Sequence, residues 1–361
     1  MINTAAPPVQ QDGLLVQIQK MPHGDLHFCY DAASQATLII AIDSTQRGPA
    51  LGGCRYQNYP SLHAAITDVC MLAQGMTYKA ALAGLPLGGG KAVIIKDKAQ
   101  HDRKAVFRAF GKFVNQLGGR YITAVDAGTN VDDIQVAQQY SPYCTGLPHV
   151  HGFQRGDPSY YTTLGVVLGM ECAVHHRLGK DSLKDVHVAI QGLGHVGYFL
   201  AQMLSERGAQ ITACDTNEAL LQRAVQDFSV TPCAVDAIYD VAADIFSPCA
   251  LGGTLNQHSV SRLRCDIIAG SANNQLASPE IGQLLADKQI LYAPDYVINS
   301  GGLIFAAQQY LQTNEEAVKQ HLAHVNKTLN NLFSHALAQK EPTSLLADRM
   351  AQEILKDNKN P

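Results

Sequence analysis

The chain has 361 residues, of which 46% are hydrophobic and 16% are charged, and its formal net charge is -4. This balance is typical of a globular protein of two or three domains with a large core, and it excludes extensive disorder and a strong basic field for nucleic acid or an anionic membrane. The sequence shows neither a secretory signal nor an apolar run of about 18 residues, so we expect a cytoplasmic protein with no membrane and no nucleic-acid partner.

The first half of the chain is predicted to alternate strands and helices. Short apolar runs rich in β-branched residues predict strands, and apolar residues at spacings of three and four predict helices. A glycine-rich stretch at 48–53 predicts a loop. In chain order we expect a strand at 37–42, a helix at 62–76, a strand at 92–95, a helix at 103–117 and a strand at 121–125.

The second half follows a segment rich in glycine, proline and polar residues at 149–158, which we interpret as a hinge. A connecting helix is expected at 161–177, and then strands and helices alternate again, which indicates a parallel sheet with helices on both faces. The predicted strands are 186–190, 210–214, 244–246, 267–269 and 290–292, and the predicted helices are 196–207, one carrying an apolar stripe from 318 to 332, and 344–355.

The cysteines argue against a metal site or a disulfide framework. There are nine, an odd number, and none lies in a CxxC pair. Most fall inside apolar runs, so we interpret them as buried thiols in a reducing compartment and expect no bound metal.

A dinucleotide fingerprint lies at the start of the second half. Gly192, Gly194 and Gly197 form a GxGxxG pattern between a predicted strand and a predicted helix, and a second strand ends in Asp215, 18 residues past Gly197. The first glycine permits the tight turn, the second lets the backbone approach a pyrophosphate, and the third lets the helix pack closely on the strand. The carboxylate would accept hydrogen bonds from the ribose and repel a 2′-phosphate, so NAD is favoured over NADP. The alternative is a glycine turn in an α/β unit that binds nothing.

A glycine-rich stretch in the first half ends in a lysine. Gly88 to Gly90 precede Lys91 and the predicted strand, which suggests a lysine reaching into a cleft from the start of a strand. Ala92 stands where a Walker loop needs Ser or Thr, so we set phosphate binding through this loop aside. A single lysine beside such a turn is more often simply solvated.

Longer motifs make the sequence resemble the Glu/Leu/Phe/Val amino-acid dehydrogenase family, most closely its leucine and phenylalanine branch. The resemblance covers nearly the whole chain. It is carried by six motifs in the same order: GPALGG at 48–53, MTYKAALAGLPLGGGKAVII at 76–95, YITAVDAGTNVDD at 121–133, SPCALGG at 247–253, IIAGSANNQL at 267–276 and YAPDYVINSGGLI at 292–304.

The resemblance implies an α/β fold of two domains separated by a cleft. We expect a substrate, catalytic and oligomerisation domain at 1–150 and a Rossmann NAD-binding domain at 151–335. A C-terminal helix at 336–361 would return to the first domain. The family also implies a homo-oligomer, from dimer to octamer.

The implied reaction is the reversible NAD-dependent oxidative deamination of an apolar L-amino acid to a 2-oxo acid and ammonia. Hydride would pass from Cα to the nicotinamide, water would attack the imine, and the carbinolamine would collapse. Lys79 would hold the substrate carboxylate, Lys91 would be the general base, with its pKa lowered by burial and by the charge of Lys79, and Asp126 would carry protons to and from the amine.

The resemblance also implies further contacts. Thr162 would orient the nicotinamide carboxamide. The other expected substrate contacts are Leu51, Gly52, Gly53, Met76, Ala124, Asn274, Asn299, Leu303 and Ala306. The other expected cofactor contacts are His195, Val196, Cys249, Ala250, Ala272 and again Asn274.

Some positions depart from the family pattern and leave the substrate open. Ala306 is smaller than the valine expected there, Phe305 stands in place of Asn or Gln, and Val125 could raise the pKa of Asp126. One methylene is worth only about 1–3 kcal/mol in such a pocket, so Leu, Val, Ile, Met and Phe all stay open, and we favour branched chains. No role is assigned to the histidines of the segment 149–152.

Three rival readings remain. The first is the same chemistry on phenylalanine or tryptophan. The second is a non-catalytic NAD-sensing paralogue. The presence of Lys79, Lys91 and Asp126 argues against it, because loss of any of them would have supported it. The third is a hydroxy-acid oxidoreductase, which needs a histidine base, and His195 inside the glycine turn is poorly placed for that role.

Overall fold

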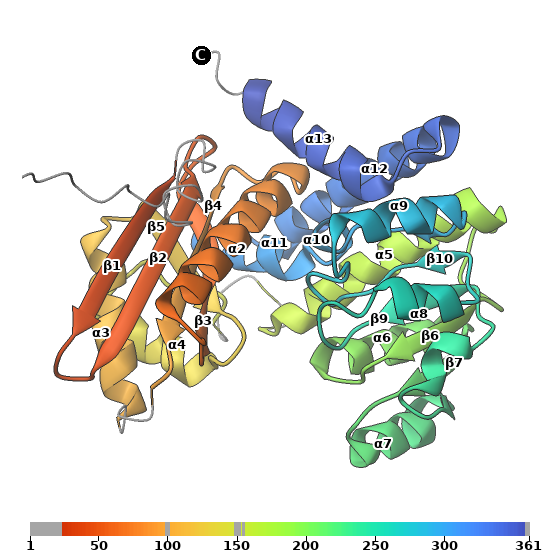
Figure 1. Ribbon diagram of the computed structural model, residues 1–361, viewed down its shortest axis with the longest axis horizontal. Coiled ribbons are helices and arrows are strands. Elements are labelled where there is room, and N and C mark those ends of the chain that lie inside the picture. Colours follow the sequence, from red (N-terminus) through yellow and green to blue (C-terminus); the bar gives the residue numbers. More distant parts are fainter. Residues whose placement is uncertain (1–23, 98–101, 148–152, 154–155, 358–361) are drawn as a thin grey trace, which may run out of the picture. The chain divides into compact units, whose positions relative to one another are not determined.

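The computed structural model describes residues 24–97, 102–147, 153 and 156–357 (Figure 1). Contacts divide the chain into two compact units, one formed by Met1–Tyr78 and Pro86–Leu147 and the other by Lys79–Leu85 and Pro148–Pro361. Most of the predicted hinge, with its two histidines, lies outside the described residues. No helix in the described part of the chain is long and apolar enough to cross a membrane.

The first unit is built on a mixed five-stranded sheet in the order β1-β2-β4-β3-β5. β1 and β2 are antiparallel, as are β2 and β4, whereas β3 runs parallel to both β4 and β5. The elements of this unit are β1 (Asp25–Asp31), β2 (Ala36–Ser44), β3 (Ala50–Gln57), α2 (Leu62–Leu82), β4 (Gly88–Ile95), α3 (Arg103–Gln116), β5 (Tyr121–Val125) and α4 (Val131–Gln138), and only the last turn of α2 is grouped with the other unit.

Helices cover both faces of this sheet. Successive strand residues point to opposite faces, and Ala92 and Ile94 of β4 pack with α3 and α4 in one core cluster. Val93 packs with α2 in a second cluster on the other face. Lys91 alternates with Ala92 and therefore shares the α2 face with Val93.

Two glycine-rich stretches, which we predicted to be a loop and a turn, belong to strands in the structure. The 48–53 loop is largely β3, and the turn before Lys91 belongs to β4, so this lysine lies inside a strand rather than at its start. A Cβ on Gly52 would lie 1.8 Å from the carbonyl oxygen of Gly90, so glycine is needed here where two strands meet closely. In addition, α2 runs on past residue 76, and β1 and α4 were not predicted.

The second unit carries a six-stranded sheet in the order β11-β10-β9-β6-β7-β8, with every pair parallel. Counted from β6, this is the 3-2-1-4-5-6 order of dinucleotide-binding sheets. The predicted Rossmann fold of this unit is confirmed. The strands are β6 (His187–Gln191), β7 (Gln210–Cys214), β8 (Thr231–Pro232), β9 (Ile245–Pro248), β10 (Ile267–Ile268) and β11 (Leu291–Tyr292).

Helices and one 3-10 turn surround this sheet (Figure 1). Side chains of α8 and α9 pack against it in one core cluster, and α5 packs against α6, α11 and α12. The helices are α5 (Pro158–Leu178), α6 (His195–Glu206), α7 (Glu218–Phe228), η1 (Ala237–Asp240), α8 (Gln257–Arg262), α9 (Pro279–Asp287), α10 (Asp295–Ile298), α11 (Gly301–Tyr310), α12 (Glu315–Gln339) and α13 (Thr343–Asp357).

The final helix packs within its own unit, against α9, α12 and β11. The expected return of residues 336–361 to the first domain stays a prediction. Thr343 at the start of α13 donates a hydrogen bond to the carbonyl oxygen of Tyr292 at 2.6 Å. The short connection after α12 keeps α13 beside the sheet that it follows.

Candidate functional site

The predicted base and proton carrier lie together in the first unit. The Nζ atom of Lys91 is 2.9 Å from the Oδ2 atom of Asp126, and the Nε atom of Arg55 lies 3.3 Å from the same oxygen. Lys91 is only 5% exposed. Because β4 supplies the lysine and the end of β5 supplies the aspartate, strands that flank β3 on either side bring the two together.

The ion partners control the protonation of the aspartate. Burial opposes the charged form of Asp126, but Lys91 and Arg55 outweigh it and hold the pKa of Asp126 below its usual value. We expected that the apolar neighbour Val125 could raise this pKa, but the net shift is downward. Val125 is partly buried and packs against the core cluster that includes α3. The role of Lys91 as the general base stays a prediction.

Arg55 is a functional candidate that the sequence did not reveal. Its Nη1 atom also donates to both oxygens of Asp68, at 3.2 and 3.0 Å, and Tyr59 donates to Asp68 at 2.5 Å. Burial disfavours the guanidinium, but the carboxylates of Asp126 and Asp68 raise the pKa of Arg55 overall. A lone arginine after a stretch predicted as a loop carried no signal, because its role depends on β3 being a central strand.

Among the expected substrate contacts of this unit, Gly53 lies against the ion pair. A Cβ on Gly53 would lie 2.8 Å from the Cβ of Asp126, so this glycine permits the close approach of β3 to the aspartate. Gly53 is paired with Ala124 in the sheet, and Leu51 is buried in β3. Met76 lies half-buried on α2.

A second cluster lies in the other unit around Lys79, in the last turn of α2. The Nζ atom of Lys79 donates to the Oδ1 atom of Asn299 at 2.7 Å and to the Oδ1 atom of Asn273 at 3.3 Å. Asn274, which was predicted to contact the substrate and the cofactor, adopts a left-handed backbone with φ of 52°, and its predicted contacts stay a prediction. The sequence held two adjacent asparagines, and only the loop conformation decides which one faces the lysine.

The substituted position 305 belongs to an aromatic cluster. Phe305 is fully buried and stacks on Tyr161 with ring centroids 4.6 Å apart, and Phe153 meets it edge-on at 5.2 Å. Its side chain is therefore used in packing. Leu303 is half-buried and Ala306 is 6% exposed, on the same helix α11.

The fingerprint glycines have the conformations that their roles require. Gly192 has a φ of 98°, a backbone conformation that residues with a side chain rarely adopt. A Cβ on Gly197 would lie 2.0 Å from the carbonyl oxygen of Gly192. Asp215 accepts the backbone N–H groups of Leu193 at 2.6 Å and Asn217 at 2.7 Å. Each carboxylate oxygen has two lone pairs, so both can still accept a ribose hydroxyl.

The remaining predicted cofactor contacts line the carboxyl edge of the same sheet. Cys249 N–H donates to the carbonyl of Gln191 at 2.8 Å, and Ala272 N–H donates to the carbonyl of Pro248 at 2.9 Å. Ala250 lies against Gly192, and the Thr162 hydroxyl lies beside Gly302 of α11 and donates to Pro158 at 2.9 Å.

The space over this edge suits a dinucleotide. No atom would lie within 4 Å of a Cβ on Gly194, so the turn is open where a pyrophosphate is expected. His195 and Val196 begin α6, whose first N–H groups are available to an anion. The residues therefore fit the predicted cofactor.

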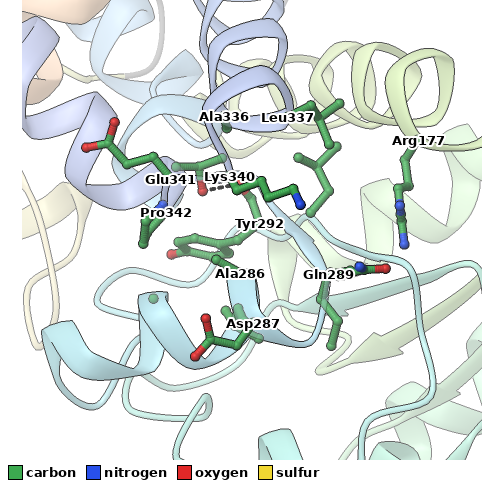
Figure 2. A pocket seen from close by; sticks show the side chains of 15 residues that line it. Arg177, Ala286, Asp287, Gln289, Tyr292, Ala336, Leu337, Lys340, Glu341 and Pro342 are labelled. Atoms are coloured by element: carbon green, nitrogen blue, oxygen red, sulfur yellow. Dashed lines mark hydrogen bonds between the residues drawn. The ribbon is translucent and has the colours of Figure 1, made fainter.

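A cavity of about 400 Å³ in the same unit is a separate feature (Figure 2). Arg177, Tyr292 and Lys340 line it, with parts of α9 and the connection between α12 and α13. None of the predicted site residues is among its lining. The described residues also contain no group of His, Cys, Asp or Glu that could hold a metal ion.

Two alanine variants of the fingerprint should separate folding from binding. In Gly197→Ala the new methyl group meets backbone, so we expect the free energy of unfolding to fall by about 3 kcal/mol or more and NADH binding to be lost. In Gly194→Ala the methyl group enters open space, so we expect wild-type thermal stability with weakened NADH binding. Thermal unfolding measures the stability of each variant, and NADH fluorescence titration measures its affinity for NADH. Wild-type NADH affinity in Gly194→Ala would show that the pyrophosphate does not lie there.

Comparison with known proteins finds amino-acid dehydrogenases by family, by sequence and by structure. The family "Glu/Leu/Phe/Val dehydrogenase, dimerisation domain" matches residues 31–142, and "Glutamate/Leucine/Phenylalanine/Valine dehydrogenase" matches residues 157–225 and 216–357. The chain is 44% identical over 336 residues to leucine dehydrogenase of Thermoactinomyces intermedius, covering 93% of this chain and 92% of that one. It is 42% identical over 339 residues to phenylalanine dehydrogenase of Bacillus thermotolerans, covering 92% and 88%. The crystal structure of L-tryptophan dehydrogenase from Nostoc punctiforme is similar with a TM-score of 0.83 and 37% identity, over 96% of this chain and 100% of that one.

Proposed function

This chain belongs to the Glu/Leu/Phe/Val dehydrogenase family and is an amino-acid dehydrogenase, and we propose that it oxidatively deaminates an apolar L-amino acid, with NAD as oxidant. The products are the 2-oxo acid, ammonia and NADH, and the reaction is reversible. The observation that carries the proposal is the ion pair between the buried Lys91 and the partly buried Asp126, at 2.9 Å.

The ion pair can perform the two proton transfers of a deamination. In its neutral form Lys91 takes a proton from the water that adds to the imino carbon, and Asp126, once protonated, gives a proton to the amine as it departs. A proton shared between a buried lysine and aspartate needs no bulk water. Arg55 keeps Asp126 ionised and oriented, so that it begins as an acceptor.

The cluster around Lys79 supports binding of the substrate carboxylate. Its ammonium is held by the amide oxygens of Asn299 and Asn273, which are neutral and leave its positive charge uncompensated by them. The amides position the cation, and the charge attracts the substrate.

NAD supplies the hydride acceptor when it is bound. The preference for NAD over NADP rests on Asp215 at the end of β7, because a carboxylate repels a 2′-phosphate. The next residues, Thr216, Asn217 and Glu218, offer no cation to offset that repulsion.

The substrate is proposed to be a branched-chain amino acid. Leucine dehydrogenases are prominent among the relatives, and phenylalanine and tryptophan dehydrogenases are also similar, so the aromatic alternative must be tested directly. We also propose a homo-oligomer, supported by the match of the first unit to a dimerisation domain.

Steady-state assays that follow NADH absorbance at alkaline pH test the proposal. Each L-amino acid is offered in turn with NAD, and the reverse reaction is run with a 2-oxo acid and with or without ammonium. We expect the highest kcat/KM with branched-chain substrates, a lower value with phenylalanine, little activity with NADP, and an absolute need for ammonium in reverse.

Three outcomes would change the conclusion. A highest kcat/KM with phenylalanine or tryptophan would transfer the assignment to aromatic substrates. Reverse activity without ammonium would indicate hydroxy-acid chemistry. NADH binding with no rate on any amino acid would indicate a sensing protein that keeps the fold.

A further inference from the structure

Asp295, the first residue of α10, holds a loop from outside its own helix. One carboxylate oxygen accepts the backbone N–H of Gln275 at 3.1 Å, and the other accepts the N–H of Tyr296 at 2.9 Å. The carboxylate also accepts the backbone N–H of Asn274. A residue that served only to begin α10 would bond N–H groups of α10 alone, so the bonds to residues 274 and 275 indicate a wider role.

Asn299 holds the same loop one helical turn later. Its Nδ2 atom donates to the carbonyl of Ser271 at 3.0 Å and to the Oδ1 atom of Asn273 at 2.8 Å, while its own Oδ1 atom accepts from Lys79. The loop from 271 to 275 is therefore fastened to the α10 segment at both ends. Between the fastening points lies Asn273, the second amide that contacts Lys79.

The loop needs this support because its backbone is strained. Asn274 adopts a left-handed conformation with φ of 52°, which costs a non-glycine residue about 1 kcal/mol or more. Asp295 accepts the N–H of this residue and of the one that follows. The carboxylate thus stabilises the conformation that turns the Asn273 side chain towards Lys79.

We propose that Asp295 is a positioning residue for substrate binding, which fixes residues 273–275 so that the amides of Asn273 and Asn299 orient Lys79. The proposal rests on the proposed role of Lys79 in holding the substrate carboxylate. Asp295 itself touches neither the substrate nor the reacting atoms. Its removal therefore acts on KM for the amino acid more than on kcat.

The charges around Asp295 give a second consequence. Burial raises its pKa, and the attraction of Lys79 and the backbone N–H groups opposes that rise without cancelling it. The other titratable groups that face it are Tyr292, whose hydroxyl accepts the Asp295 N–H at 3.3 Å, Tyr296, and Asp348, to which Tyr296 donates at 2.6 Å. The Tyr292 ring also forms part of the cavity wall (Figure 2).

Because the attraction between Asp295 and Lys79 is mutual, the carboxylate favours the protonated lysine. Loss of its charge should move the alkaline limb of the kcat/KM profile to lower pH. A purely structural residue would not shift this limb.

The test is Asp295→Asn with Asp348→Asn as the matched control. The first change removes the charge and leaves an NH2 group facing one of the N–H groups that the carboxylate accepts, from the loop or from Tyr296, so we expect KM for the amino acid to rise about 10-fold or more, with kcat within about 3-fold. The control loses charge in the same tyrosine network but bonds no residue of the loop, so its KM and pH profile should match wild type. Thermal unfolding shows whether each variant is folded.

Hydrogen–deuterium exchange of peptides covering 271–276 gives a readout that needs no activity. Exchange in this loop should quicken in Asp295→Asn and stay at the wild-type rate in Asp348→Asn. Unchanged KM, pH profile and exchange in Asp295→Asn would overturn the proposal. So would equal effects in the two variants. If the wild-type protein is inactive and loop exchange is still faster in Asp295→Asn, the proposed function is contradicted. The proposal that Asp295 fixes residues 273–275 would then still hold.

Discussion

Lys91→Ala is expected to lower kcat by about 10²- to 10⁴-fold, the usual contribution of a general base, while NADH binding stays at the wild-type level. The change removes the group that deprotonates the attacking water, and it leaves Asp126 with Arg55 as its only ion partner among the described residues. The measurement is kcat for the preferred amino acid by NADH absorbance, together with NADH fluorescence titration of the same sample.

Lys104→Ala is the matched control for this variant. Lys104 lies exposed on α3 in the same unit, so its loss removes an equal charge without touching the site. We expect wild-type kcat. A Lys91→Ala enzyme that retains more than about a tenth of wild-type kcat would exclude Lys91 as the base.

Asp126→Asn is expected to have a comparable effect on kcat, about 10²-fold or more, because an amide of the same shape cannot carry the proton to the amine. It also leaves Lys91 and Arg55 as buried cations that repel each other. We therefore expect the free energy of unfolding at neutral pH to fall by about 2 kcal/mol. Single-turnover NADH formation and urea unfolding measure the two effects.

The stability difference should depend on pH with a defined sign. The pKa of Asp126 is lowered in the folded protein, so its ion pairs stabilise the fold above the unfolded-state pKa of about 3.9. That stabilisation is lost as the pH falls through the folded-state pKa. Wild type and Asp126→Asn should thus converge in acid. A difference that persists unchanged at low pH would mean that the ion pairs are not its source.

Asp68→Asn provides the control for Asp126→Asn. It weakens the other ion pair of Arg55 and leaves the 2.9 Å contact of Lys91 and Asp126 in place. We expect kcat within about 10-fold of wild type. A loss as large as that of Asp126→Asn would mean that orientation by Arg55, and not proton transfer, limits the rate.

Local patterns that depend on neighbours in the chain could be interpreted directly from the sequence. The GxGxxG turn is such a case, because strand, turn and helix are consecutive, and Asp215 follows at a fixed distance on the next strand. The strand order of the second unit agrees with the Rossmann domain that this fingerprint predicted. Motifs spread along the whole chain likewise identified the family.

Glycine-rich stretches were ambiguous for a physical reason. Glycine signals a turn when the chain reverses, but it also occurs where two strands come so close that no Cβ fits. Only the neighbouring strand distinguishes these cases, and for Gly52 and Gly90 that neighbour is far away in the sequence. For this reason the predicted loop at 48–53 was wrong. Arg55 was not recognised as a site residue because it lies in the same strand, β3.

The amino-acid sequence by itself determined the family and the Rossmann unit, and it singled out Lys79, Lys91 and Asp126 as candidates. The tertiary structure decided which groups these side chains meet. It paired Asp126 with both Lys91 and Arg55, and it made Asn273 a partner of Lys79. It also placed the Asp295 carboxylate against the loop that carries Asn273. Such partners are set by strand order and loop conformation, which bring residues together across up to 220 positions of sequence. Local propensity cannot encode contacts at that separation, so they appear only when the sheets are assembled.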